Sequence, residues 1–165
     1  SLFMAHIHDK IDFTVEVFIV YKNRVLLRVH DKYKKWMSIG GHIELDEDPV
    51  QAAHRDVREE VGLEIELVGN QKLCSEPETR FSELLPPVAL NRHNTNKEGH
   101  EHVTLVYFAR AKTTKIQAQH ADDKSEECRW FTKQELDKLD LWPNVRSYAL
   151  AALHRLGKSH IADEK

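Results

Sequence analysis

Two apolar stretches within the first thirty residues, the first of which begins with alternating apolar and polar positions, predict two paired strands. Residues 11–21, IDFTVEVFIVY, are rich in β-branched and aromatic types, and RVLLRVH at 24–30 has the same character. Lys22 and Asn23 separate the two stretches. A two-residue connection between apolar strands is typical of a β-hairpin, so we expect the pair to be antiparallel.

After Asp48 the apolar period changes to that of a helix, which we expect over 49–61. Asp48 can cap this helix, Pro49 suits its first position, and Gln51 stands where the partner of a capping box belongs. Gly62 suits the left-handed conformation that ends many helices. The stripe that should pack on the sheet consists of Val50, Ala53, Val57 and Val61.

Strands and helices follow one another in the rest of the chain without strict alternation. Thr132 and Glu135 form a second capping box that begins a short helix, and the last helix runs from Pro143 to Gly157. Further strands are expected at 63–69, 88–90, 102–111 and 127–131. This order indicates an α/β fold with a mixed sheet and helices on both faces, rather than a doubly wound parallel sheet.

The length of 165 residues is enough for one compact domain and too short for two of ordinary size. We therefore expect a single domain over 1–165, with its core at about 11–157 and terminal segments at 1–10 and 158–165. A charged fraction of 31% beside a hydrophobic fraction of 41% is typical of a soluble globular protein.

The net charge of −3 gives no support for nucleic acid or a membrane as a partner, although a small anion needs only a local cation. Apolar runs fall short of the roughly 20 residues that cross a bilayer, and the N-terminus lacks the pattern of a secretory leader. Cys74 and Cys128 favour reduced thiols over a disulfide framework. We therefore expect a cytoplasmic protein, either a monomer or a homodimer.

Three carboxylates crowd the second half of the predicted helix. Asp56, Glu59 and Glu60 share one face, where like charges repel by a few tenths of a kcal/mol per pair, and the nearby helix C-terminus also disfavours anions. A solvated acidic face is the ordinary interpretation. The repulsion nevertheless favours a bound cation, and Mg²⁺ prefers such hard oxygen ligands. Gly40 and Gly41 would let the backbone approach that ion closely.

The spacing of these residues is specific. Gly41 is followed after five residues by Glu47, and after seven more by RDVREEVGL, from Arg55 to Leu63. This pattern closely resembles the Nudix box, which specifies glycine, glutamate, arginine, glutamate, an aliphatic, two glutamates, glycine and an aliphatic. Eight of these nine positions match, and the exception is Asp56, where the family carries glutamate. The order of the surrounding segments is also similar to the family: a hairpin precedes the box, and the strand HVTLVYFARA and then ECRWFTKQEL follow it.

The resemblance implies an α/β/α sandwich and hydrolysis of a nucleoside diphosphate linked to another group, with Mg²⁺ or Mn²⁺. The substrate would be a nucleoside triphosphate, a nucleotide sugar or a compound of the ADP-ribose class. Arg55 would orient the acidic cluster, and Glu47 would support the loop or a second metal ion. The metal ligands would be the Gly40 carbonyl and the carboxylates of Asp56, Glu59 and Glu60. The aspartate side chain is about 1.5 Å shorter than glutamate, so it could bind the metal through water.

The general base is open among several carboxylates. One of the helix glutamates could serve, and in some relatives a glutamate from a later loop does so instead. In this chain that glutamate would be Glu127 or Glu126, with Glu101 as a third choice. A surface role is the competing interpretation for these three residues.

Side chains around the box are expected to bind the substrate. Arg28 and Lys35 could meet phosphates, Trp36 could stack on a base, and His42 lies inside the box. A solvated loop is the alternative for the cations. Lys32 and Lys34 are further cations of this stretch, and Tyr33, Phe81 and Tyr107 are further aromatic residues, with core packing favoured for Tyr107.

Two other functions compete with hydrolysis, and the histidine pairs raise the separate question of a zinc site. A nucleotide-binding sensor without turnover is suggested by Asp56. Isopentenyl-diphosphate isomerase chemistry on the same fold needs an active-site cysteine, for which Cys74 is poorly placed. The pairs His6/His8 and His100/His102 suggest zinc, but without cysteines at metal-site spacing we interpret them as surface histidines.

Overall fold

The predicted hairpin opens the fold. A computed structural model describes residues 8–30, 32–74, 80–117 and 127–157. In it β1 (Ile11–Tyr21) and β2 (Arg24–Val29) are antiparallel, with Tyr21 opposite Arg24. Lys22 has a φ of 52°, so the two-residue turn contains the left-handed residue that tight hairpins require. The prediction of a hairpin here is confirmed.

The strands of the described ranges join into one mixed sheet of eight strands, ordered β3-β2-β1-β7-β5 along its main path. β4 pairs with β1, β6 with β7, and β8 with β2. β1 and β7 are parallel, whereas the other pairs are antiparallel. The remaining strands are β3 (Trp36–Met37), β4 (Ile39–His42), β5 (Ile65–Val68), β6 (Ala89–Asn94), β7 (Glu101–Ala111) and β8 (Cys128–Phe131).

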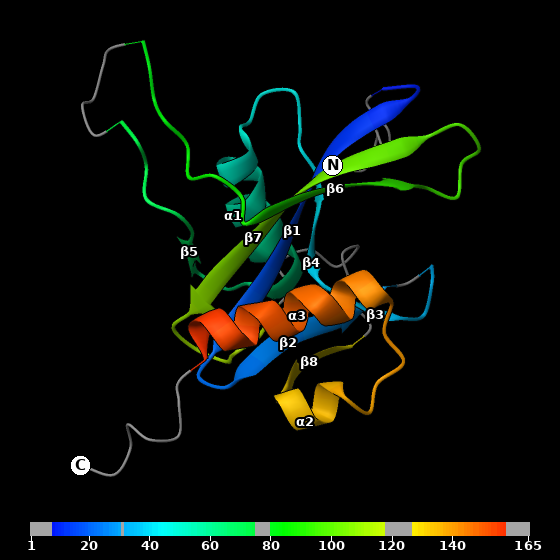
Figure 1. The fold of residues 1–165 in the computed structure, drawn as a ribbon, viewed down its shortest axis with the longest axis vertical. Helices are drawn as coiled ribbons and strands as arrows, with labels where there is room; N and C mark the ends of the chain where they lie inside the picture. Colours follow the sequence, from blue (N-terminus) through cyan, green and yellow to red (C-terminus); the bar gives the residue numbers. More distant parts are fainter. Residues whose placement is uncertain (1–7, 31, 75–79, 118–126, 158–165) are drawn as a thin grey trace.

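Helices cover both faces of this sheet, as the sequence predicts (Figure 1). The helices are α1 (Pro49–Val61), α2 (Lys133–Leu136) and α3 (Pro143–Leu156). β1 sends Val17 and Ile19 into the core under α1, and Phe18 and Val20 into the core under α3. Alternate residues of a strand point to opposite faces of the sheet. Because β1 is covered on both faces, its residues 17–20 are all apolar. Across the described residues, no helix is long and apolar enough to span a membrane.

The caps of α1 fix where its side chains point. Asp48 Oδ1 accepts from the Gln51 backbone N–H at 2.9 Å, and Gln51 Oε1 accepts from the Asp48 N–H at 2.9 Å. Gly62 ends the helix in the left-handed region, with a φ of 65°. These caps confirm the predicted boundaries. Gly157 also ends α3, but in an extended conformation rather than the left-handed one.

The sheet extends into two stretches where no strand was predicted. The segment around the glycine pair forms β3 and β4, and β6 continues to Asn94, beyond the 88–90 predicted. The sequence of β6, ALNRHN, is too polar to suggest a strand. It pairs with the long edge of β7 from Ala89 opposite Val106 to Asn94 opposite Glu101, and this pairing supplies its backbone hydrogen bonds.

Candidate active site

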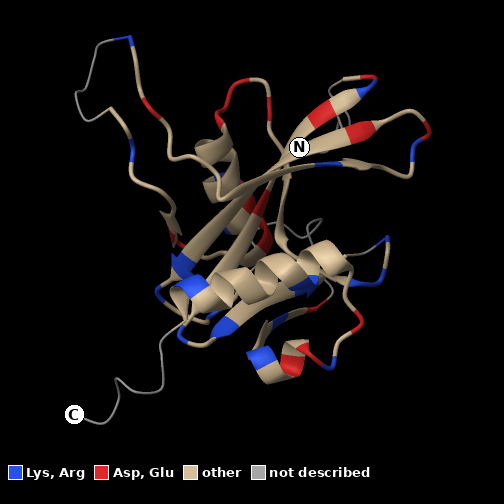
Figure 2. Cartoon of the chain, viewed as in Figure 1, with Lys and Arg blue, Asp and Glu red and all other residues tan. Residues whose placement is uncertain are grey.

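The acidic face of α1 packs against the glycine pair of β4. Asp56 is 5% exposed, and a Cβ atom placed on Gly41 would lie 3.2 Å from Asp56 Oδ2. Glu60 Oε2 accepts from the Gly40 backbone N–H at 3.3 Å. The absence of a side chain on Gly41 therefore lets Asp56 approach the β4 backbone. Figure 2 shows the acidic positions in red on α1 and on the loop before it.

Arg55 holds this cluster together. Its Nη1 donates to Asp56 Oδ1 at 2.6 Å and to Glu59 Oε2 at 3.3 Å, while Nε donates to Glu47 Oε2 at 2.9 Å. Nη2 donates to the His42 carbonyl at 3.0 Å. One guanidinium thus joins the helix acids to the loop before the helix and to the end of β4, which is the arrangement that its planar fork favours.

The electrostatics of the cluster suit a divalent cation. Burial raises the pKa of Asp56 to about 7, even though the adjacent Arg55 acts in the opposite direction. Asp56 Oδ2 is buried and has no hydrogen-bond donor among the described residues. A buried carboxylate oxygen without a donor is costly, and a cation would satisfy it. The nearby carboxylates supply the oxygen ligands that Mg²⁺ prefers.

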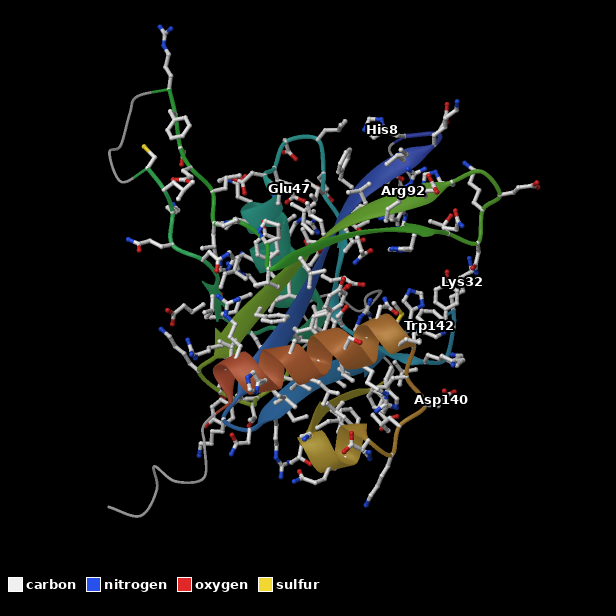
Figure 3. The ribbon with its side chains drawn as sticks, in the orientation of Figure 1. His8, Lys32, Glu47, Arg92, Asp140 and Trp142 are labelled. Carbon is white, nitrogen blue, oxygen red and sulfur yellow. The ribbon has the colours of Figure 1, made fainter. Side chains whose placement is uncertain are left out.

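Arg28 connects the acids to a cavity. Its Nη2 lies 3.1 Å from Glu60 Oε1, and the two side chains are 15% and 12% exposed. Arg28 and Gly40 line a cavity of about 850 Å³, which also borders β6, β7 and the start of α3. In Figure 3, Arg92 of β6 lies above Lys32 and Trp142, and all three residues line this cavity. A volume of this size can hold a nucleotide-sized ligand.

Comparison with known proteins gives the family. The model of the NUDIX domain matches residues 12–153. The chain belongs to the Nudix family. A Nudix-family hydrolase from Clostridium perfringens is 30% identical, with a TM-score of 0.78 over 88% of this chain and 97% of that one. No curated protein sequence matches the chain.

Two more distant structures share the Nudix fold. A MutT Nudix hydrolase from Burkholderia pseudomallei is 22% identical, with a TM-score of 0.61 over 90% of this chain and 99% of that one. The Nudix domain of Shewanella oneidensis NrtR, solved in complex with ADP ribose, is 18% identical, with a TM-score of 0.59 over 92% of this chain and 91% of that one. These matches confirm the predicted sandwich of a mixed sheet and flanking helices.

The structure divides the predicted substrate contacts of this Nudix chain into two groups. Arg28 and His42 line the cavity, as does Tyr33. Lys35 and Trp36 are not among the described residues that line the cavity. Lys35 Nζ pairs with Asp140 at 3.0 Å on the surface, and Trp36 packs edge-on against Phe131, because β3 turns it toward the core under α3. Trp142, which the sequence did not suggest, takes the place next to the cavity.

Two of the later candidates for the general base, Glu127 and Glu101, lie within the described residues. Glu127 is exposed, and its backbone carbonyl accepts from Val29 N–H at 2.9 Å. Glu101 forms an ion pair with Arg92. Glu126 lies outside the described residues. Tyr107 is 1% exposed in the core, as favoured from the sequence, and Phe81 is 49% exposed. The role of Glu127 stays a prediction.

Glu16 is a cavity residue that sequence reasoning missed. It lies opposite Gly40 in the pairing of β1 with β4, and burial raises its pKa to about 7. Its Oε2 has no hydrogen-bond partner among the described residues. The available signal was a lone acid inside the apolar run VEVFIV.

The interpretation of the histidine pairs as surface residues is wrong for one pair. His100 is 1% exposed, and its Nε2 lies 3.1 Å from Oδ2 of the equally buried Asp12. Burial and neighbouring histidines lower the pKa of His102 to about 4. His8 is exposed, and His6 lies outside the described residues. The parallel pairing of β7 with β1, which the sequence does not reveal, places His100 and His102 beside the first residues of β1.

Proposed function

We propose that this chain hydrolyses the phosphoanhydride bond of a nucleoside diphosphate linked to another group, with Mg²⁺ or Mn²⁺. One observation carries the proposal: Arg55 gathers the acids of the Nudix box against the glycine pair of β4, at the edge of a nucleotide-sized cavity. Acids on a rigid helix are better placed for such chemistry than acids on a loop.

The chain's own residues would divide the work. Asp56, Glu59, Glu60 and the Gly40 carbonyl would hold the metal, which when bound neutralises phosphate oxygens and activates the attacking water. Arg55 keeps the carboxylates oriented. A carboxylate of α1 would take the proton of the water, and Glu127 is the alternative acceptor.

Substrate binding is assigned to the cavity. Arg28, already at 3.1 Å from Glu60, would bind a phosphate oxygen next to the acids. Tyr33 and Trp142 face each other edge-on with ring centroids 5.3 Å apart, and either ring could stack on a base. The NrtR Nudix domain with ADP ribose supports a ligand of the ADP-ribose class among those to be tested.

A substrate panel tests the proposal. The purified chain would be incubated with nucleoside triphosphates, nucleotide sugars and ADP-ribose in Mg²⁺ or Mn²⁺, and the release of phosphate, pyrophosphate or nucleoside monophosphate measured. We expect turnover of at least one class and a loss of at least about 100-fold in kcat for Glu60→Gln. Glu66→Gln, an exposed change on β5, is the matched control and should keep full activity.

The result that contradicts the proposal is equally definite. Turnover that is unaffected by Glu60→Gln would remove the acids of α1 from the mechanism. Binding of a nucleotide, seen as a shift in melting temperature, without turnover of any panel member would favour the sensor function instead.

A further inference from the structure

Metal-ligand side chains form a second cluster near the start of β1, where β4 and β7 pair with it. Asp12 and His102 are register partners in the parallel pair of β1 and β7. His42 is the partner of Thr14, two residues further along β1. Because residues two apart on a strand share a face, Asp12, His42 and His102 project from three strands to the same side of the sheet.

The distances within this cluster fit a metal site. One ligand atom from each of Asp12, His42 and His102 lies within 4.8 Å of the others. Asp12 Oδ2 and His42 Nε2 are 3.6 Å apart. The ligands of a tetrahedral zinc ion are roughly 3.3 Å from one another at normal bond lengths. Small side-chain rotations would therefore bring the three atoms to coordination distance.

Asp12 is buried and oriented by its neighbours. It is 1% exposed, and its Oδ1 accepts from the His8 backbone N–H at 2.8 Å. Its Oδ2 lies 3.1 Å from His100 Nε2, and the other ring nitrogen of His100 lies 3.1 Å from the Asp9 carbonyl. Contacts that fix the direction of a ligand side chain form the usual outer shell of a metal site.

The cluster opens toward the cavity. His42 and His102 both belong to the cavity lining, and so does His93 of β6. The ring centroids of His42 and His102 are 4.9 Å apart, and those of His93 and His102 are 5.4 Å apart. A fourth ligand could therefore come from His93, from water or from an oxygen of a bound substrate.

We propose that Asp12, His42 and His102 form a binding site for a divalent transition metal of the zinc class, with its fourth position open to the cavity. Two imidazoles and one carboxylate suit Zn²⁺ or Co²⁺, whereas Mg²⁺ prefers oxygen ligands alone. The three ligands of the proposed site are different residues from the carboxylates of α1. Its existence does not depend on the proposed hydrolysis.

Cobalt serves as a spectroscopic probe for this site. The chain, free of any purification tag, would be stripped with a chelator and titrated with Co²⁺ in excess Mg²⁺, which competes for the box carboxylates. We expect one equivalent of Co²⁺ to give the intense visible absorption of a four-coordinate ion, and Zn²⁺ to displace it. His102→Gln should weaken Co²⁺ binding by more than about 100-fold, and His100→Gln by roughly 10- to 100-fold.

Controls place the ion in the structure. His154→Gln, an exposed change on α3, and Glu60→Gln, in the box, should both keep the absorption. Asp12→Asn is a second ligand variant of unchanged shape, and a cooperative unfolding transition shows that each variant is folded. Absorption that survives both His102→Gln and Asp12→Asn would overturn the proposal. So would its loss in Glu60→Gln alone, or the absence of one-equivalent binding to the unaltered chain.

Discussion

At the scale of single residues, Gly40 and Gly41 exclude a side chain for different reasons. Gly40 has a φ of +150°, and a Cβ atom there would lie 2.0 Å from the Val15 carbonyl oxygen. At Gly41 the added atom would meet the carboxylate of Asp56 at 3.2 Å, and a side chain can shift more easily than a backbone. The first glycine therefore serves the packing of β4 on β1, and the second leaves room for the acid.

This difference predicts separable effects of two alanine substitutions. Gly40→Ala should lower the free energy of unfolding by about 3 kcal/mol or more, because both the backbone conformation and the clash oppose it. Gly41→Ala should cost less stability but reduce kcat, because Asp56 must move by a few tenths of an ångström. Urea unfolding and turnover measured on both variants check this, and equal loss of stability in the two would contradict it.

Glu16 should make stability depend on pH. Its pKa is raised from 4.5 to about 7 in the folded chain, so the folded state holds more protons than the unfolded state between these values. Its contribution to stability is therefore fully present below pH 4.5 and is lost as the pH rises through about 7. Glu16→Gln should stabilise the chain at pH 8 by at most roughly 3 kcal/mol and change little at pH 4.5.

The measurement compares urea unfolding of Glu16→Gln and the unaltered chain at both pH values in the presence of a chelator. Asp56 also has a raised pKa and titrates in the same window, but it is common to both chains and cancels in the difference. A stability difference that does not change between pH 4.5 and 8 would show that Glu16 titrates normally.

At the scale of elements, α1 was predictable because its signals are local. Asp48, Pro49 and Gly62 mark its ends through contacts within one turn, and the structure has the helix at Pro49–Val61. The spacing of its acids was equally readable. Their burial was not, because it depends on β4, whose glycines pair with β1 more than twenty residues earlier in the chain.

The side chains whose surroundings the sequence did not predict are placed by strand pairing. Trp36 was expected beside a ligand because it precedes the glycine pair. Its direction is set instead by the pairing of β3 with β2, which places it against Phe131. The histidines and Asp12 meet through the parallel register of β1 and β7, a long-range property that leaves no pattern in either segment alone.

Arg55→Lys tests whether the link between α1 and its preceding loop needs a guanidinium. Lysine keeps the charge but cannot contact Glu47, Asp56, Glu59 and the His42 carbonyl together. We expect a fall in kcat of at least about tenfold and a loss of roughly 1–3 kcal/mol in the free energy of unfolding. Arg58→Lys, on an exposed pair with Glu64, is the control, and equal behaviour of the two variants would contradict the assignment.

At the scale of the whole molecule, the two proposed metal sites should respond to different ions. Mg²⁺ at about 100 times its dissociation constant would add about 2.7 kcal/mol of stability, which corresponds to roughly 5–10 °C in melting temperature for a chain of this size. Glu60→Gln should abolish this shift, whereas His102→Gln should keep it. Thermal unfolding with and without Mg²⁺ checks this, and a shift retained by Glu60→Gln would mean that Mg²⁺ binds elsewhere.

The parallel pair of β1 and β7 also has a consequence for biosynthesis. Thr14 and Thr104 share a hydroxyl hydrogen bond of 2.6 Å although they stand 90 residues apart. A nascent polypeptide emerging from the ribosome therefore displays every Nudix-box residue long before the central strand β7 is made. Closing so long a loop is slow, so a chain cut short before residue 101 should carry the complete motif and yet assemble neither site.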